Sequence, residues 1–324
     1  MRIMKNLNEL MQQDMQELDR VIRSDLTSNI ALINQISEYI IAAGGKRIRP
    51  LLTLLCGRIA GVNDGDLLYK MAAMIEYIHT ATLLHDDVVD ESGMRRGRET
   101  SNAVFGNAAS VLVGDFIYTR AFQMMVQGNS VELLSVMANC TNKISEGEVL
   151  QLLNIGKSDL AETEYFAVIE SKTAALFEAA ARVAAIVAGS DVDVANALAS
   201  YARNLGTAFQ VTDDILDYVG DSATIGKNIG DDLLEGKVTL PLIYILQHGS
   251  EAQQRLLTNA IATPKSADLS VILDMIVNSG AIEYVTGAAQ KFVGASIAAL
   301  KVFPESQYKD AMIELAHMAV ERVS

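Results

Sequence analysis

Apolar residues recur every three or four positions along almost the whole chain, with polar residues between them. This spacing is typical of amphipathic α-helices, and no convincing run alternates at every second residue as a strand would. The pattern predicts helices over residues 7–23, 30–43, 67–90, 107–126, 131–154, 163–188 and 192–218. Further helices follow over 240–323, with Pro304 placed to open the last one. The chain is therefore predicted to be all-α.

At 324 residues the chain is long enough for one large domain or two ordinary ones, and we expect a single helical domain over residues 1–324. Half of the residues are hydrophobic, four are proline, and no Pro/Gly/Ser-rich linker divides the chain. No uncharged apolar run reaches 18 residues, and residues 1–20 lack the hydrophobic stretch of a secretory signal. Cys56 and Cys140 fit neither a disulfide framework nor a zinc site. We expect a cytoplasmic protein without stable membrane insertion.

The net charge of −14 argues against binding to nucleic acid or to an anionic membrane surface. Some of the positive charge is nevertheless concentrated. Six of the 26 lysines and arginines lie in two short stretches: Lys46, Arg47, Arg49, Arg95, Arg96 and Arg98. Clusters of this size predict sites for small anions.

Three carboxylates end the helix predicted over 67–90, namely Asp86, Asp87 and Asp90. Their spacings of one and four residues place them on one helix face. A divalent cation would remove their repulsion, and Mg²⁺ is usually held by one or two carboxylates together with substrate phosphates. Arg95 and Arg96 follow directly, and guanidinium groups match phosphate oxygens. The segment therefore predicts a site for Mg²⁺ and phosphate.

A single Asp-Asp-x-x-Asp pattern is weak evidence, because acidic residues at helix ends are usually just solvated. This chain repeats the pattern at Asp213, Asp214 and Asp217, on another apolar helix. Two such clusters facing each other across a helical cavity would hold several Mg²⁺ ions and a diphosphate between them. The repeat is the strong signal.

Two glycine-containing segments carry further positive charge. Residues 44–50 either cap a helix before solvated basic residues or bind an anion at the start of the next helix. Residues 220–237 hold four glycines with Lys227 and Lys237, and we interpret them as a lid that closes on phosphates. Taken alone, Lys172 would more often snorkel than act in chemistry, and His79 would more often be a hydrogen-bonded core residue.

With these motifs the chain resembles the trans-polyprenyl diphosphate synthases. The matching runs are GGKRIRP at 44–50, HTATLLHDDVVDESGMRRG at 79–97, GNAASVLVGDF at 106–116, EGEVLQL at 146–152, SKTAALFEAAA at 171–181, GTAFQVTDDILDY at 206–218 and GKNIGDDLLEGKVTLPL at 226–242. Thr212 is a mild departure, because many relatives have an apolar residue before the second pair of aspartates. The resemblance implies an all-α bundle of antiparallel helices around a deep central cavity, commonly as a homodimer.

The resemblance also implies the reaction and the residues that carry it. Isopentenyl diphosphate condenses with an allylic diphosphate such as farnesyl diphosphate, with three Mg²⁺ ions that mostly bridge to diphosphate. The direct metal ligands are Asp86, Asp90 and Asp213. Three further aspartates either bind the metal as well or support these ligands from behind: Asp87, Asp214 and Asp217. The allylic diphosphate is held by Arg95, Lys172, Lys227 and Lys237, with the oxygen dipoles of Thr173 and Gln210 beside the carbocation. Isopentenyl diphosphate is bound by Lys46, Arg49, His79 and Arg96, with Arg47 nearby.

A long product of about C40, of the kind that supplies respiratory quinone side chains, is expected. Ala81 and Thr82 lie one turn before the first acidic cluster, where relatives with short products place an aromatic side chain. Small residues there let the growing tail pass deeper. Met125 and Met137, with Phe122 near, are candidates for the floor of the cavity, although filling the core is an equally good interpretation of both methionines.

Three other kinds of protein share parts of these motifs. Glu76-x-x-His79 and Glu314-x-x-His317 are units that di-iron carboxylate bundles use, but two further inward glutamates are not identifiable. Terpene cyclases share only the first acidic cluster. A non-catalytic partner subunit of a synthase would have lost aspartates from these clusters, and here both clusters keep all three.

Overall fold

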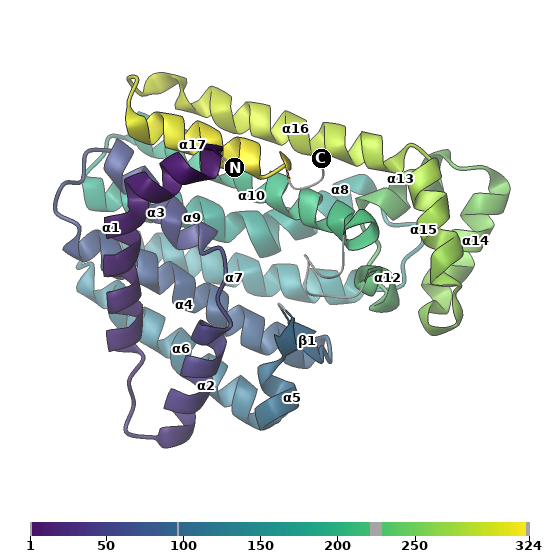
Figure 1. The fold of residues 1–324 in the computed structure, drawn as a ribbon, viewed down its shortest axis with the longest axis horizontal. Coiled ribbons are helices and arrows are strands. Elements are labelled where there is room, and N and C mark those ends of the chain that lie inside the picture. Colours follow the sequence, from purple (N-terminus) through teal and green to yellow (C-terminus); the bar gives the residue numbers. More distant parts are fainter. Residues whose placement is uncertain (1, 96, 221–228, 322–324) are drawn as a thin grey trace. The chain divides into compact units, whose positions relative to one another are not determined.

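The computed structural model describes residues 2–95, 97–220 and 229–321, and Figure 1 shows that these are helical almost throughout. The prediction of an all-α fold is confirmed. The first ten helices are α1 (Arg2–Asp25), α2 (Ala31–Ala42), α3 (Ile48–Ile59), α4 (Asp66–Val89), α5 (Ser101–Phe105), α6 (Asn107–Gln127), α7 (Val131–Asn154), α8 (Glu162–Ile169), α9 (Ala175–Ala188) and α10 (Val192–Val219). They are followed by α12 (Asp231–Leu234), α13 (Leu240–His248), α14 (Glu251–Ala262), α15 (Leu269–Asn278), α16 (Ala281–Ala299) and α17 (Gln307–Met318).

The chain divides into two compact units, each built from separate stretches of sequence. Unit 1 comprises residues 1–140, 176–202 and 299–314. Unit 2 comprises residues 141–175, 203–298 and 315–324. The two units are described separately below, and the single domain expected for residues 1–324 stays a prediction.

Helix α4 is the centre of unit 1. Its sequence is apolar on nearly every side, so it is buried along most of its length, as Leu68, Met71, Ile75 and Ile78 illustrate with 0% exposure. It packs against α1, α3 and, most extensively, α6. Figure 1 shows α4 and α6 running side by side. The first acidic cluster lies at the end of this helix, and its position is therefore fixed by a well-packed core.

Helix α1 binds to this core through apolar and polar contacts. Leu7, Met11 and Leu18 are buried at intervals of four and seven residues, as expected for one face of an amphipathic helix. Two polar anchors add specificity. The carboxylate of Asp14 accepts hydrogen bonds from Arg58 and Tyr69, and Tyr77 donates a hydrogen bond of 2.7 Å to the carbonyl of Ile22.

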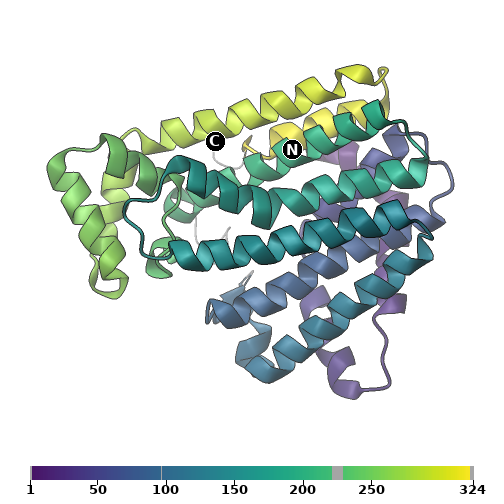
Figure 2. The same cartoon turned by 180° about the vertical axis from the view of Figure 1, so that it is seen from behind.

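Unit 2 has its own hydrophobic core. The second half of α10 contributes Val211, Ile215 and Tyr218, and α13 contributes Leu240 and Leu242. The short helices α13, α14 and α15, coloured green in Figure 2, lie close together beside them. This core positions the second acidic cluster, which lies on α10.

Three local features differ from the predicted pattern. Residues Met94–Arg95 and Arg98–Glu99 form two short antiparallel strands, which are too short to show alternation. The helix predicted over 163–188 is interrupted by a π-helical turn, Glu170–Ala174. The last helix begins at Gln307 rather than at Pro304, because residues 303–306 are not helical.

Within the described residues, no individual helix combines the length and the apolar character needed to cross a membrane. By length and composition alone, Leu269–Asn278 and Ala281–Val302 qualify only as a pair, bent by 63°.

Candidate functional site

The first acidic cluster occupies the last turn of α4, and its three carboxylates have different surroundings. Asp86 and Asp90 are partly exposed, whereas the side chain of Asp87 is only 1% exposed. The Oδ1 atom of Asp87 accepts a hydrogen bond of 2.7 Å from Nε of Arg95. Such a charge-assisted contact offsets the cost of burying a carboxylate. Asp86 and Asp90 are therefore the members of the cluster that can meet a ligand from solution.

Arg95 reaches Asp87 because the chain folds back after α4. The side chain of Asn102 donates hydrogen bonds to the carbonyls of Asp87 and Ser92, at 3.1 and 3.2 Å. The hydroxyl of Thr100 donates to the carbonyl of Ser92 at 2.6 Å. These bonds fix the two short strands against the end of α4. Arg96, the second predicted phosphate ligand here, lies outside the described residues.

The predicted isopentenyl diphosphate site begins at the turn between α2 and α3. Lys46 is exposed, and Arg49 lies in the first turn of α3, with its guanidinium 3.2 Å from Nε2 of His79. Because a guanidinium group has only donors, Nε2 of His79 must be the acceptor. Arg49 also lies over the ring of Phe177, 4.7 Å from its centroid. The structure thus brings Arg49 and His79, two of the predicted ligands, together from two helices.

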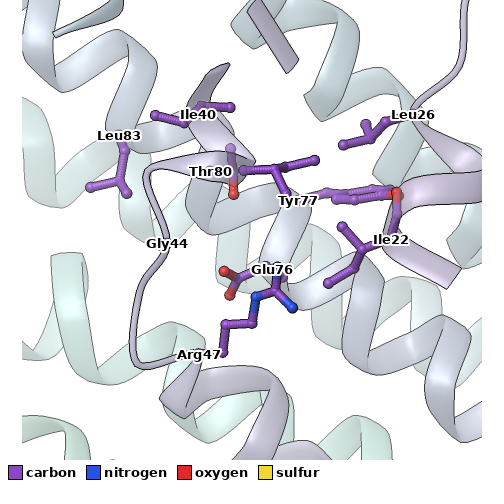
Figure 3. Close-up of a pocket in the computed structure, with 10 residues that line it drawn as sticks. Ile22, Leu26, Ile40, Gly44, Arg47, Glu76, Tyr77, Thr80 and Leu83 are labelled. Atoms are coloured by element: carbon purple, nitrogen blue, oxygen red, sulfur yellow. The ribbon is translucent and has the colours of Figure 1, made fainter. Parts of the chain in front are cut away.

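Arg47 differs from these neighbours. It lines a narrow pocket between α1, α2 and α4, together with Gly44, Glu76 and Tyr77 (Figure 3). The cavity volume is about 20 Å³, which is room for roughly one water molecule and not for a substrate. The guanidinium of Arg47 forms an ion pair with Asp19 of α1.

The second acidic cluster lies in unit 2 and is organised around Asp214. Tyr165 donates a hydrogen bond of 2.6 Å to Oδ2 of Asp214, and the amide of Gln210 donates one of 2.8 Å to Oδ1. The hydroxyl of Thr173 in turn donates to Oε1 of Gln210 at 2.8 Å. Gln210 is therefore oriented from both sides, and both oxygens of Asp214 are engaged.

The charges around Asp214 are crowded. Burial, followed by the neighbouring carboxylate of Asp232, raises the pKa of Asp214 to about 8. Asp217 is also buried, at 9% exposure, and it accepts a hydrogen bond of 3.2 Å from the backbone of Asp232 at the start of α12. Asp213 alone in this cluster is exposed. It is the carboxylate that can meet a ligand from solution.

Lys172 lies in the π-helical turn, a feature that often occurs at functional sites. Its ammonium group donates hydrogen bonds to Glu148 at 2.6 Å and to Gln151 at 2.7 Å, both on α7. Lys237 similarly contacts Glu235 at 2.6 Å. Both predicted diphosphate ligands thus have carboxylate counterions within unit 2. Lys227 lies outside the described residues, as do the other residues of the predicted lid from 221 to 228.

The residues expected to set product length all lie in unit 1. Ala81 and Met137 are 0% exposed, and Met125 is 1% exposed. Thr82 is partly buried and donates a hydrogen bond to the carbonyl of His79. Phe122 differs from the two methionines, because it is 40% exposed and packs against Tyr118 on the same helix.

The available donors fit Mg²⁺. Within the described residues, no three acidic, histidine or cysteine side chains are arranged to hold a metal by themselves. Asp86, Asp90 and Asp213 nevertheless present carboxylate oxygens at accessible positions, and the crowded charge at Asp214 is of the kind that a cation relieves. Each cluster, taken within its own unit, fits an ion that is completed by water and substrate phosphates.

The comparisons with known proteins agree with this arrangement. The family model for polyprenyl synthetase matches residues 30–277. The chain is 49% identical to the octaprenyl diphosphate synthase of Escherichia coli over 320 residues, which is 98% of this chain and 99% of that protein. Among solved structures, a Caulobacter crescentus polyprenyl synthase complexed with calcium and isoprenyl diphosphate has a TM-score of 0.95 at 42% identity, covering 99% and 98% of the two chains. A Rhodobacter capsulatus decaprenyl diphosphate synthase has a TM-score of 0.93 at 40% identity, covering 99% of both chains.

The fold and the paired acidic clusters thus define a polyprenyl synthase, an all-α prenyltransferase. The chain belongs to the polyprenyl synthetase family. The resemblance seen in the motifs is confirmed.

Several residues around the site were missed in the sequence. Glu148 and Gln151 lie in the matching run at 146–152, and Asp232 lies in the run at 226–242, so a signal was present for all three. Tyr165 and Asp19 belong to no motif. Their contacts with Asp214 and Arg47 cross 49 and 28 residues of sequence respectively, and only the tertiary structure brings them together.

Proposed function

We propose that this enzyme is a long-chain all-trans polyprenyl diphosphate synthase with a product of about C40, the octaprenyl length. It joins isopentenyl diphosphate to an allylic diphosphate such as farnesyl diphosphate. The observation that carries the proposal is the presence of two carboxylate clusters. Arg95 contacts Asp87 in the first, and in the second Thr173, which follows Lys172, is hydrogen-bonded through Gln210 to Asp214. The similarity to octaprenyl diphosphate synthase over nearly the full chain supports the product class.

In this proposal Asp86, Asp90 and Asp213 bind Mg²⁺, three ions in all, and share them with the allylic diphosphate. Bound Mg²⁺ would stabilise the negative charge that develops on the departing diphosphate. Asp87 and Asp214 support these ligands from behind, through the contacts with Arg95 and with Gln210 and Tyr165. Asp217 orients α12 through the backbone of Asp232.

Arg95, Lys172 and Lys237, with Lys227, hold the allylic diphosphate. Their charges act on oxygens that become more negative as the allylic C–O bond breaks, so they stabilise the transition state more than the bound substrate. Thr173 and Gln210 direct oxygen dipoles toward the allylic carbocation. The hydrogen bond between them keeps both oxygens in place.

Lys46, Arg49, His79 and Arg96 bind isopentenyl diphosphate. Its double bond attacks the carbocation, and the proton that is then lost passes to the departed diphosphate. None of these residues is a dedicated strong base, which is why the diphosphate itself is assigned this role.

We further expect a homodimer in the cytoplasm whose product supplies respiratory quinone side chains. Helix α6 exposes Leu112 at 67%, Phe122 at 40% and Val126 at 67%, and a second copy of the chain would cover this apolar face. Sedimentation of the wild-type protein beside a Leu112→Glu, Val126→Glu double variant tests the dimer. A monomeric wild-type protein would contradict it.

The test of the activity is incubation with farnesyl diphosphate, isopentenyl diphosphate and Mg²⁺, followed by chromatography of the dephosphorylated products. Products of about C40 are expected, and excess EDTA should abolish them. Asp86→Ala and Asp213→Ala should each lower kcat by about 100-fold or more, because each removes an interaction made in the transition state. Full activity in EDTA would overturn the metal assignment.

A further inference from the structure

Arg47 lies between two predicted ligands of isopentenyl diphosphate, yet its side chain is placed differently. Lys46 is exposed, whereas the side chain of Arg47 is only 16% exposed and forms an ion pair with Asp19. Asp19 belongs to α1, about one turn before Ile22, whose carbonyl accepts the hydrogen bond from Tyr77 of α4. Arg47 therefore connects the turn at 44–47 to a helix that is itself fixed to the core of unit 1.

The backbone at Arg47 explains why the turn needs such a contact. Its φ of 45° and ψ of 41° are left-handed, a conformation that is unfavourable for a residue with a side chain. Gly44, at φ 68°, adopts this region without that cost. The carbonyl of Arg47 accepts the first hydrogen bond of α3, from the amide of Leu51 at 3.0 Å. The conformation of Arg47 thus sets the direction in which α3, and Arg49 with it, begins.

Glu76 lies beside the same guanidinium group. In Figure 3 its carboxylate and the guanidinium of Arg47 point toward one another, and both residues line the same small pocket. Glu76 lies on α4 one turn before His79, the residue that contacts Arg49. The guanidinium of Arg47 thus lies among α1, the turn and α4, and it is adjacent to the elements that carry Arg49 and His79.

We propose that Asp19 and Glu76 are positioning residues for the isopentenyl diphosphate site, and that Arg47 is the anchor they hold and not a ligand of the diphosphate. The inference rests on the proposed function for its assignment of Lys46, Arg49 and His79 to this substrate. It gives α1 a role in the reaction, because α1 supplies the carboxylate that fixes the turn.

The experiment compares Asp19→Asn with Glu17→Gln, a matched loss of one carboxylate on the same helix. Glu17 forms its ion pair with Arg20, three residues further along α1. Asp19→Asn should raise KM for isopentenyl diphosphate about tenfold, and it should leave kcat and KM for the allylic substrate within twofold. Asp19→Glu should recover most of the loss, because it restores the charge. Glu17→Gln should match the wild-type enzyme.

A second measurement does not depend on activity. Amide hydrogen exchange over residues 44–51 should be about tenfold faster in Asp19→Asn than in either the wild-type protein or Glu17→Gln. Unchanged exchange in this segment would overturn the anchoring role. An unchanged or lower KM for isopentenyl diphosphate would overturn the positioning role, since a lower KM would mean that releasing Arg47 supplies a ligand. If exchange changes but the wild-type protein makes no polyprenyl product, the proposed function fails and the anchor stands.

Discussion

Gly114 of α6 faces the imidazole of His85 on α4 so closely that a Cβ atom added to Gly114 would lie 2.4 Å from Nε2 of His85. The same ring nitrogen lies 3.2 Å from the carbonyl of Val111 and 3.3 Å from the carboxylate of Asp115. His85 directly precedes Asp86. The absence of a side chain at Gly114 therefore lets α6 hold the residue next to the first acidic cluster.

The first prediction follows from this contact. Gly114→Ala should push the imidazole off α6, lowering the free energy of unfolding by about 1–3 kcal/mol and lowering kcat severalfold. His85→Ala should remove the obstruction, so the double variant should be more stable than the sum of the two single changes predicts. Urea denaturation of all four proteins measures this coupling. Strictly additive changes would show that the two residues do not interact.

The second prediction concerns Tyr165, which donates a hydrogen bond to the buried carboxylate of Asp214. This bond lowers the pKa of Asp214 against the stronger effects of burial and Asp232, so its loss should raise that pKa further. Tyr165→Phe should therefore lower kcat severalfold and raise the Mg²⁺ concentration needed for half-maximal activity. It should also cost about 1–3 kcal/mol of stability, because an acceptor loses its donor in the interior.

Tyr201→Phe is the matched control for that experiment. Tyr201 is also buried, but its hydroxyl donates to the carbonyl of Met312 in unit 1, at 2.6 Å. Both variants should be destabilised, and only Tyr165→Phe should change the Mg²⁺ dependence. A similar change in both would assign it to lost stability.

The sequence predicted the helices well because most of them are long and strongly periodic. Residues 131–154 were predicted to the residue, and the helix predicted over 67–90 differs by one residue at each end. The π-helical turn around Lys172 was not predictable in this way, because a single inserted residue barely alters apolar spacing. Helix α7 approaches this turn closely, since a Cβ on Gly147 of α7 would lie 2.8 Å from Cβ of Ser171.

The site was predicted less completely than the fold. Local spacing revealed the aspartates of both clusters, but not which of them are buried. Asp87 and Asp214 resemble their neighbours in sequence, whereas in the structure their oxygens are held by Arg95 and Tyr165. These contacts depend on the fold of the chain around each cluster.

The third prediction concerns pH and the attachment of α1. Burial raises the pKa of Asp14, but the hydrogen bonds from Arg58 and Tyr69 and the charge of Arg58 outweigh it, so the net effect lowers that pKa. A carboxyl whose pKa is lower in the folded state stabilises the fold above its unfolded pKa, about 3.9, and loses that contribution as the pH falls through the folded value. The difference in unfolding free energy between the wild-type protein and Asp14→Asn should therefore be constant above about pH 5 and shrink below about pH 4. Urea denaturation at a series of pH values measures it, and a difference that grows on acidification would contradict the assignment.

The last prediction concerns product length. Ala81 is completely buried on α4, five residues before Asp86, so a phenylalanine at this position must take space from its surroundings in unit 1. If the growing tail passes this position, Ala81→Phe should shorten the products sharply. Met137→Ala, alone or with Met125→Ala, should lengthen them by removing buried side chains that close the tube.

Each methionine change should also cost about 2–5 kcal/mol of stability. The product chain lengths are therefore compared at a temperature where all variants are folded. Phe122→Ala is the comparison on the same helix as Met125, and its effect should be smaller because Phe122 is 40% exposed. Chromatography of the dephosphorylated products gives the chain lengths directly. Unchanged product lengths in the Ala81→Phe enzyme would contradict the proposed path of the growing chain past Ala81. Wild-type products that end at C15 or C20 would contradict the long-chain assignment itself.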